Sequence, residues 1–496
     1  MQRQSGGSLL MRAVLVVAVV AAADSALGGA TSPLRPTLAT TIVAGAEGSC
    51  ALTRAGGVKC WGYNGEDQLG TGQQGLVASS VPVDVSGLAT GVAALAGGDR
   101  HTCALMSAGG VKCWGMADSG ELGDGTTLRR LAPVDVVGLS SGVKAVAASV
   151  DSSCALTTAG AVKCWGSNTS GALGDGTTTN RSAPVDVVGL GSGVTALTVG
   201  CAVTTAGAVK CWGGSYGLTP VDVFAPGSGI VAVTHACALT SAGGVKCWGR
   251  NDRGQVGDGT TVDRATPVDV VGLTSGVTAV SAWGGHACAL LSAGGVKCWG
   301  ENDFGQVGDG TTVDRLSPVG VAGLSSGVTA ISAGVFHTCA VLHDGGVKCW
   351  GVSGVGQLGD GSQVNTGLGS GDPAARRLTP VAVVGFGPLA TTTIVSRLVA
   401  VTPGRLATLT LRCGAPARCR GTVTLTARGP GKLGAKRFSI PAGSTRAVAI
   451  PLSTRGFQAL ARARRLSAQA RVSYEQVPGV TVAATRTIAL TAPGTR

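Results

Sequence analysis

One short phrase recurs seven times in this 496-residue chain: a Cys, nine residues, and then Cys-Trp-Gly. Successive Trp residues of this phrase lie 53, 51, 47, 36, 51 and 51 residues apart. A period near 50 residues is typical of one four-stranded propeller blade. The repeat therefore predicts an all-β fold whose main part, residues 39–389, is a seven-bladed β-propeller. The seven Cys pairs are Cys50 with Cys60, Cys103 with Cys113, Cys154 with Cys164, Cys201 with Cys211, Cys237 with Cys247, Cys288 with Cys298, and Cys339 with Cys349.

The amino terminus is laid out like a secretory signal peptide. Arg3 and Arg12 precede an uncharged apolar run, Ala13–Ala23, which is too short to span a bilayer. The small residues that offer cleavage points are Ala23, Ala26 and Ala30. We expect residues 1–30 to direct export, which makes the protein secreted or associated with the cell envelope. The alternative is a retained lipid-inserted anchor, and no later stretch qualifies as a transmembrane helix.

The Cys count agrees with export. Sixteen Cys, an even number, predict eight disulfides in an oxidising environment, with Cys413 and Cys419 as the pair outside the repeats. Metal binding is the alternative, but the closely spaced Cys-x2-Cys knuckle of zinc sites is missing from the repeats.

The second repeat shows how one blade is expected to form. Its strands are predicted at 92–96, 101–106, 111–114 and 133–137. A three-residue turn with Gly109 in the left-handed conformation sets Cys103 opposite Cys113. In that register the two residues form a pair without mutual hydrogen bonds, whose Cα atoms lie about 4.5 Å apart.

The phrase HTCALxxxGGVKCWGxNxxGQLGDGTT…PVDVxGL resembles the repeat of the regulator of chromosome condensation family, from about Ala39 to Gly387. The resemblance implies seven-bladed propellers. The family's namesake binds chromatin and exchanges guanine nucleotide on a small GTPase, and another member is a secreted bacterial inhibitor of β-lactamase. A GTPase regulator and a secreted enzyme inhibitor are therefore alternatives that the resemblance offers. No exchange-site motif matches residue by residue, so no functional residue is transferred.

The Asp and the His that recur in the repeats are both expected to have structural roles. One acid per loop supplies too few oxygens for calcium, so a role in the turn is expected for Asp124, Asp175, Asp258, Asp309 and Asp360. Four His stand two residues before the first Cys of their repeats, and we expect their rings to bond backbone between strands; a metal ring in the channel is the alternative. These four are His101, His235, His286 and His337.

Variable residues gather in the loops after the first and third strand of each blade, which emerge on the same face of the disc. Aromatic and Arg side chains often anchor protein interfaces, so this face is the predicted binding surface. The alternative is that these side chains only pack their own loops. The candidates are Tyr63, Arg100, Asp151, Arg250, Arg253, Trp283, Phe304 and Phe336, with Glu66 and Met116 beside them.

No arrangement typical of an enzyme is found. No Ser/His/Asp or Cys/His set recurs at a shared position, and no phosphate-cradling loop opens a helix. We therefore predict no catalytic residue, no cofactor, no metal and no small-molecule substrate.

The tail, residues 393–496, is predicted to be a basic immunoglobulin-like β-sandwich. From Ala390 to Arg496 the sequence holds 17 Lys and Arg against one acid, Glu475. This charge could tether the protein to an anionic envelope polymer; nucleic acid is not favoured because no aromatic platform accompanies the Arg residues, and a merely solvated basic face is the alternative. A short helix is expected at 456–466. The predicted strands are Leu406–Leu411, Thr422–Ala427, Arg437–Ile440, Arg446–Leu452, Gln469–Tyr474 and Val480–Leu490.

Together these features favour an exported, disulfide-braced propeller that binds a protein or an envelope polymer through one loop face. A purely structural envelope component, without a selective partner, is a further alternative.

Overall fold

The computed structural model describes residues 37–362, 375–387, 392–396, 398–414, 419–427, 431–441, 444–477 and 480–493. The predicted signal peptide, residues 1–30, lies outside this range. The chain divides into two compact units, one spanning Thr37–Phe386 and the other beginning at Gly387.

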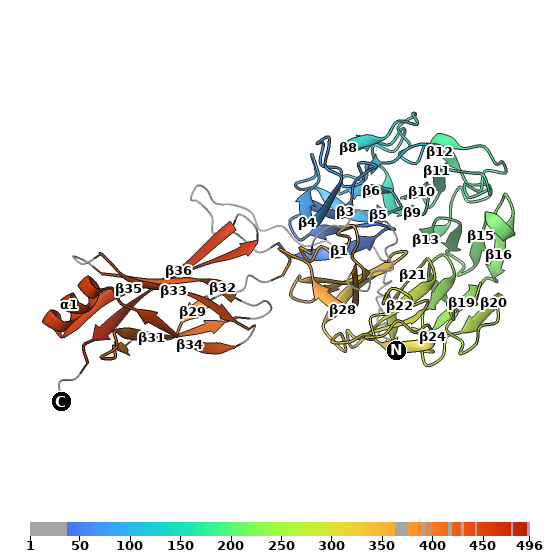
Figure 1. Cartoon of the computed structure of the whole chain (residues 1–496). Helices are drawn as coiled ribbons and strands as arrows, with labels where there is room; N and C mark the ends of the chain where they lie inside the picture. The colour runs from blue at the N-terminus through green and yellow to red at the C-terminus, as the bar shows by residue number, and fades with distance from the viewer. Residues whose placement is uncertain are drawn as a thin grey trace, which may run out of the picture. The chain divides into compact units, whose positions relative to one another are not determined.

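The first unit is a ring of seven antiparallel sheets, each of four strands in chain order (Figure 1). First strands such as β5, β9 and β13 lie toward the middle of the ring, and fourth strands such as β8, β12 and β16 lie at its rim. The strands of blades one to four are β1 Ala39–Ala44, β2 Gly48–Thr53, β3 Val58–Tyr63, β4 Ala78–Asp84; β5 Val92–Gly97, β6 His101–Met106, β7 Val111–Gly115, β8 Arg130–Asp135; β9 Val143–Ala148, β10 Ser152–Thr157, β11 Val162–Gly166, β12 Arg181–Asp186; and β13 Val194–Thr198, β14 Cys201–Thr204, β15 Val209–Cys211, β16 Val221–Phe224. Those of blades five to seven are β17 Ile230–Val233, β18 Cys237–Thr240, β19 Val245–Gly249, β20 Arg264–Asp269; β21 Val277–Trp283, β22 His286–Leu291, β23 Val296–Gly300, β24 Arg315–Gly320; and β25 Val328–Ala333, β26 His337–Leu342, β27 Val347–Val352, β28 Arg376–Ala382.

The predicted hairpin register is confirmed in blade two. Cys103 pairs with Cys113 across β6 and β7, and Gly109 closes the turn at φ 84°. The Cα atoms of this pair lie 4.1 Å apart, slightly closer than the spacing expected from the strand register alone.

The same bridge recurs in every blade, at each of the predicted pairs. With the bridge between Cys413 and Cys419 in the tail, all sixteen Cys are paired. The seven blade disulfides join Cys50 to Cys60, Cys103 to Cys113, Cys154 to Cys164, Cys201 to Cys211, Cys237 to Cys247, Cys288 to Cys298, and Cys339 to Cys349.

The fourth strand of blade two was misplaced by the sequence pattern. Predicted at 133–137, it runs from Arg130 to Asp135, because the pairing with β7 resumes at Gly115 and Arg130 across an irregularity. The apolar residues that suggested a later strand belong to its exit, where the Val136 amide donates to the Val111 carbonyl at 3.1 Å.

The repeated Trp joins each blade to the one before it. In blade one, Trp61 is fully buried and its Nε1 donates to the Gln357 carbonyl of blade seven at 2.9 Å, which closes the ring. Equivalent bonds to a loop carbonyl occur in blades two, three, four, six and seven. Blade four has lost the loop that supplies this carbonyl and forms only a short 3-10 turn, Gly214–Tyr216. The Tyr216 hydroxyl replaces the carbonyl as acceptor for Trp248 Nε1, at 2.7 Å.

Three His rings form a second kind of bond between blades. His101 Nε2 lies 2.8 Å from Ser153 Oγ, and His286 and His337 make the same contact with Thr338 and Ser49, each at 2.7 Å. The partner is thus a side-chain hydroxyl of the next blade, so the prediction of a backbone partner was wrong for His101, His286 and His337. Each hydroxyl belongs to the residue just before the first Cys of its repeat. Because the His and its partner lie in different repeats, the pattern within one repeat does not predict their contact.

The recurring loop acids hold turns together. In blade five, Asp258 Oδ1 accepts from the Thr260 amide at 2.9 Å and from the Thr260 hydroxyl at 2.8 Å, while Oδ2 accepts from Arg264 Nε at 2.5 Å. Burial alone raises the pKa of Asp258, but the hydrogen bonds from Thr260 and Arg264 outweigh it and hold the pKa below its ordinary value. The same bonds recur at Asp124, Asp175 and Asp309, which supports the predicted turn role.

Replacing this acid is expected to weaken the propeller. Asp258→Asn removes a charge-assisted bond to Arg264 from a side chain that is 8% exposed, so we expect a loss of about 1–3 kcal/mol in the free energy of unfolding. The matched control is Asp269→Asn, whose surface pair with Lys246 involves a side chain that is 60% exposed and should contribute at most about 1 kcal/mol. Chemical denaturation measures both, and equal losses would contradict the assigned role.

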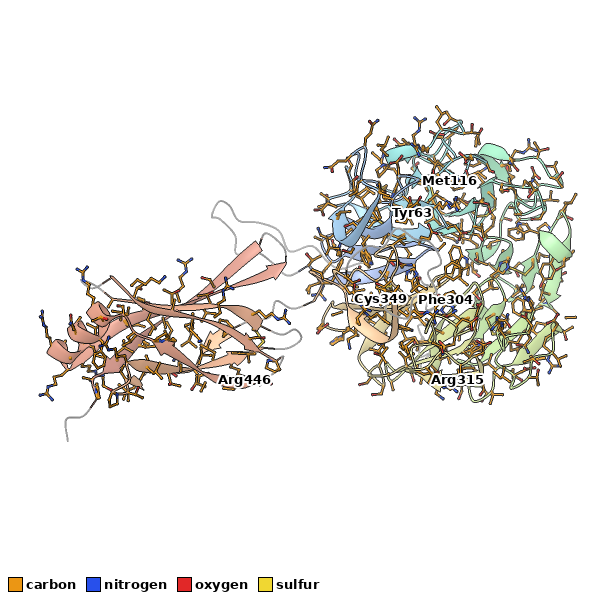
Figure 2. The ribbon with its side chains drawn as sticks, in the orientation of Figure 1. Tyr63, Met116, Phe304, Arg315, Cys349 and Arg446 are labelled. Atoms are coloured by element: carbon orange, nitrogen blue, oxygen red, sulfur yellow. A yellow bond between two sulfur atoms is a disulfide. The ribbon has the colours of Figure 1, made fainter. Side chains whose placement is uncertain are left out.

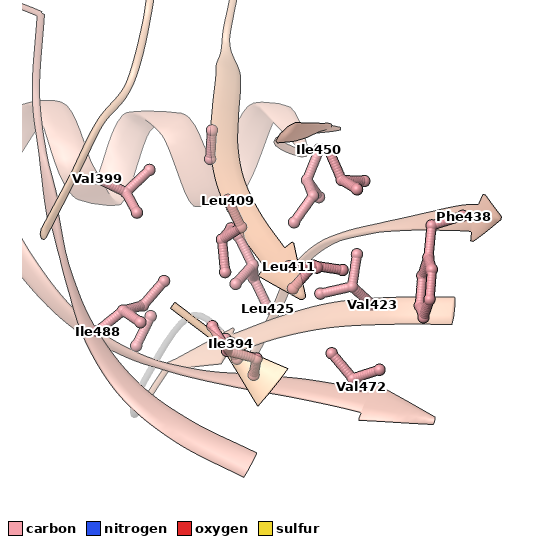
Figure 3. Packing of buried hydrophobic residues seen from close by; sticks show 14 of the residues in the cluster. Ile394, Val399, Leu409, Leu411, Val423, Leu425, Phe438, Ile450, Val472 and Ile488 are labelled. Atoms are coloured by element: carbon pink, nitrogen blue, oxygen red, sulfur yellow. The ribbon is translucent and has the colours of Figure 1, made fainter. Parts of the chain in front are cut away.

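The second unit is a β-sandwich. A three-stranded sheet, β29-β31-β34, and a five-stranded sheet, β30-β36-β35-β32-β33, enclose a core that includes Leu409, Val423 and Ile450 (Figure 3). The all-β prediction is confirmed, while the immunoglobulin-like kinship stays a prediction. The elements are β29 Thr392–Ile394, β30 Leu398–Ala400, β31 Leu406–Cys413, β32 Cys419–Ala427, β33 Gly431–Ile440, β34 Thr445–Pro451, α1 Thr454–Ala463, β35 Arg465–Val477 and β36 Val480–Thr491.

The helix of the tail begins two residues before its predicted start and ends three residues before its predicted end. Ser453 caps it by accepting from the Gly456 amide, and β35 starts at Arg465, within the predicted helix. Within the described part of the chain, no helix combines the length and the apolar character that crossing a bilayer requires.

Candidate functional site: the loop face of the propeller

The loops after the first and third strand of each blade meet on one face, which we call the loop face. In blade two, His101 pairs with Gly115, and the Met116 amide donates to the Arg100 carbonyl at 3.0 Å. Matching amide-to-carbonyl bonds join the two loops in blades one, three, six and seven. All eight predicted candidates lie in these loops or at the strand ends that lead into them. Figure 2 shows Tyr63, Met116 and Phe304 nearer the middle of the ring than Arg315 of β24.

An aromatic group lies where blades six and seven meet. The rings of Phe304 and Phe336 pack edge to face with centroids 5.5 Å apart, and Phe336 is 38% exposed. Trp283 is half-buried at the end of β21, and the next residue, Gly284, lies against Val335. The turns that carry Trp283 and Phe336 are therefore neighbours. We call Trp283, Phe304 and Phe336 the aromatic group.

Arg376 completes this surface and was missed by the sequence analysis. Its guanidinium lies over the Phe304 ring, 5.4 Å from the centroid, and its Nη1 donates to the Asp303 carbonyl at 3.0 Å. A signal was available: Arg377 pairs with Asp360 as the equivalent Arg does in other blades, so the extra Arg of the doublet needed another role.

The two Arg candidates of blade five have different surroundings. Arg253 reaches into blade six, where its Nη1 lies 3.0 Å from Asp314 and 3.3 Å from Asp303. It therefore supports the loop that carries Phe304. Arg250 is exposed and pairs with Asp252 of its own loop at 2.6 Å.

A group of acids surrounds Arg100 in blades one to three. Burial, followed by repulsion from Asp151, raises the pKa of Asp99 to about 6, although Arg100 opposes the shift. Burial also raises the pKa values of Glu47 and Asp151, again against the influence of Arg100. One exposed guanidinium therefore faces three carboxylates that it does not fully compensate, and this sector of the loop face is acidic.

Tyr63 fits the alternative that a candidate side chain only packs its own loop. A Cβ placed on Gly65 would clash with the Tyr63 hydroxyl, so the ring packs over its own loop. The described residues contain no cluster of three or more His, Cys, Asp or Glu side chains arranged to hold a metal ion.

The regulator of chromosome condensation (RCC1) repeat matches residues 55–105, 108–156, 159–208, 242–290 and 293–341, and a second form of this repeat matches 39–68, 92–121, 143–172, 277–306 and 328–357. Both leave out residues 209–241, which include the end of the shortened fourth repeat.

Two curated relatives and one solved structure are similar to the propeller. The ultraviolet-B receptor UVR8 of Arabidopsis thaliana is 32% identical over 331 residues, which cover 66% of this chain and 68% of the receptor. Human E3 ubiquitin-protein ligase HERC2 is 30% identical over 345 residues, which cover 67% of this chain but only 6% of the ligase. Prp20p of Saccharomyces cerevisiae has the same fold, with a TM-score of 0.55 and 20% identity over 70% of this chain and 87% of that one.

Proposed function

Because the chain belongs to the regulator of chromosome condensation (RCC1) repeat family, we propose that its disulfide-braced propeller is an exported module that binds a protein partner on the loop face. Prp20p, which shares the fold, is described as binding Gsp1p and histones, and this supports protein as the class of partner. The eight disulfides support an oxidising location outside the cytoplasm.

The aromatic group carries the proposal. Phe336 is a large apolar side chain exposed on a face formed by loops, and it is held in place by Phe304 rather than by core packing. Aromatic and Arg side chains are enriched at protein interfaces, where Trp, Tyr and Arg most often dominate the binding energy. The disulfide in each blade keeps the supporting hairpins stiff, so little conformational entropy is lost on docking.

The tail is proposed to act as a spacer or surface tether, and an anionic envelope polymer is its proposed ligand class. Regulation of a GTPase is the alternative suggested by the family. It requires a compartment in which the Cys residues are reduced, and the paired Cys residues argue against it.

The test is affinity capture from native envelope and medium with the protein lacking residues 1–30. We expect the double variant Trp283→Ala with Phe336→Ala to lose the selectively bound protein by at least about tenfold, because it removes two anchors. The matched control is Val188→Ala with Val271→Ala, which alters two side chains, 49% and 50% exposed, beyond the ends of β12 and β20 that lie away from the loop face. Equal recovery by both variants would show that the loop face is not the binding surface.

A further inference from the structure

A groove of about 600 Å³ opens on the β-sandwich between β33 and β34. These strands are the edges of the two sheets, β33 in the five-stranded sheet and β34 in the three-stranded sheet. The groove reaches the core through Phe438 and Val448, which are 8% and 9% exposed. Figure 3 shows Phe438 at one end of the packed core.

The groove is bounded at both ends. At one end, Gly434 bridges to Leu452 and the Ser453 amide donates to the Leu433 carbonyl at 2.7 Å. At the other end, β33 ends at Ile440 and β34 begins at Thr445. Between these points each strand pairs only with the sheet behind it, β33 with β32 and β34 with β31. The groove therefore extends along six residues of β33, from Ala435 to Ile440, and along seven residues of β34, from Thr445 to Pro451.

The walls of the groove are cationic. Lys436 and Arg437 of β33 and Arg446 of β34 line it, all three are exposed, and none makes an ion pair among the described residues. From Gly387 to the end of the chain there are 17 Lys and Arg and a single acid, so acids of this unit can neutralise at most one of these cations. The ligand that complements these walls is anionic.

The sheet edges define the shape of that ligand. An edge strand presents a row of backbone N–H and C=O groups that an added extended chain can pair with. An extended peptide that carries acidic residues can pair with the backbone groups of the edge strands and neutralise Lys436, Arg437 and Arg446 at the same time. Nucleic acid would find no aromatic ring to stack on in the groove, because Phe438 is almost fully buried. We propose that the groove between β33 and β34 binds an acidic peptide segment of another protein in extended conformation, independently of the loop face.

The probe is a fluorescein-labelled peptide of alternating Glu and Val, titrated by fluorescence anisotropy into the oxidised protein lacking residues 1–30. We expect the triple variant Lys436→Gln, Arg437→Gln and Arg446→Gln to weaken binding by at least about tenfold. The matched control combines Arg455→Gln, Arg462→Gln and Arg471→Gln, which removes the same charge from exposed residues of α1 and β35 and should retain most of the affinity. Replacing each Val of the peptide by Pro, which removes backbone donors, should abolish most of the binding.

Three outcomes overturn the proposal. Equal weakening in the two triple variants would mean that bulk charge alone attracts the peptide. Tighter binding of polygalacturonate or duplex DNA than of the peptide, with the same dependence on Arg446, would assign the groove to another polymer. Unchanged binding in the groove variant, together with its aggregation, would mean that the three cations only protect exposed sheet edges. Calorimetry of each variant, including Arg446→Gln alone, establishes that the sandwich is folded.

Discussion

Reduction of the disulfides is expected to unfold the propeller under conditions in which the oxidised protein is intact. Each blade bridge joins residues ten apart, and closing a ring of that size stabilises the folded state by about 2–3 kcal/mol through the entropy of the unfolded chain. The sum over seven blades matches or exceeds the 5–15 kcal/mol by which typical domains are stable, so we expect no cooperative native transition in the reduced chain near about 37 °C.

The measurement is near-ultraviolet circular dichroism of the buried Trp residues, with calorimetry, before and after reduction. Because the blade Cys are 0–4% exposed, reduction needs incubation close to the unfolding midpoint. Removing one bridge with Cys288→Ser and Cys298→Ser should cost about 2–5 kcal/mol. The control, Cys413→Ser with Cys419→Ser, removes the bridge of the other unit and should leave the propeller transition in place. A reduced propeller whose midpoint falls by only a few degrees would contradict this expectation.

The propeller could be predicted because its decisive features are local and repeated. The turn that ends in Gly109 sets the register of Cys103 and Cys113, and both follow from residues within one hairpin. Seven copies then predict seven sheets without any knowledge of contacts between them. In the tail the same approach found most of the longer strands but shortened β33, because cations such as Lys432 and Lys436 on a sheet edge look like loop residues.

What the sequence did not predict lies between blades. The hydroxyl partners of the His rings and the Trp248–Tyr216 bond depend on how consecutive sheets stack, and spacing within one repeat does not contain that information. The candidate site shows the same limit. Phe304 and Phe336 are 32 residues apart in sequence, and only the ring of blades brings them into contact with each other and Phe304 into contact with Arg376.

Acidification from about pH 6.5 to 4.5 is expected to destabilise the propeller through the three His at blade junctions. In blade three, Ser153 Oγ donates to the Glu121 carbonyl at 3.2 Å, so the hydroxyl accepts from His101 Nε2–H. The His286 and His337 partners also donate to loop carbonyls, and Nδ1 of both rings has no partner among the described residues. Each buried ring therefore donates from Nε2–H, and in His286 and His337 no partner stabilises a second proton on Nδ1.

The direction of the pH effect follows from the pKa values. Burial lowers the pKa of His101 and His337 to about 4, and burial together with His337 lowers the pKa of His286 to about 3. Below about pH 6.5 the unfolded chain gains protons that the folded chain does not, so the free energy of unfolding falls as pH falls. At about pH 4.5 the loss amounts to about 2–3 kcal/mol for each His.

Asp99 acts in the opposite sense within the same range. Its raised pKa of about 6 means that the folded state takes up this proton before the unfolded state does, which offsets part of the loss. The paired acids such as Asp258, whose pKa values are lowered, begin to lose their contribution as the pH falls through the ordinary carboxylate range and lose the rest below it. The His contribution must therefore be measured as a difference between variants.

The triple variant His101→Gln, His286→Gln and His337→Gln keeps an N–H donor for each hydroxyl but removes the titrating ring. We expect it to lose less stability than the wild type between about pH 7 and pH 4.5, with a difference of several kcal/mol in chemical denaturation. The control His343→Gln replaces an exposed His in the turn between β26 and β27, and its pH dependence should match that of the wild type. Parallel pH profiles for the triple variant and the wild type would mean that the pKa values of the three junction His do not change on unfolding. The acid sensitivity of the propeller would then have another origin.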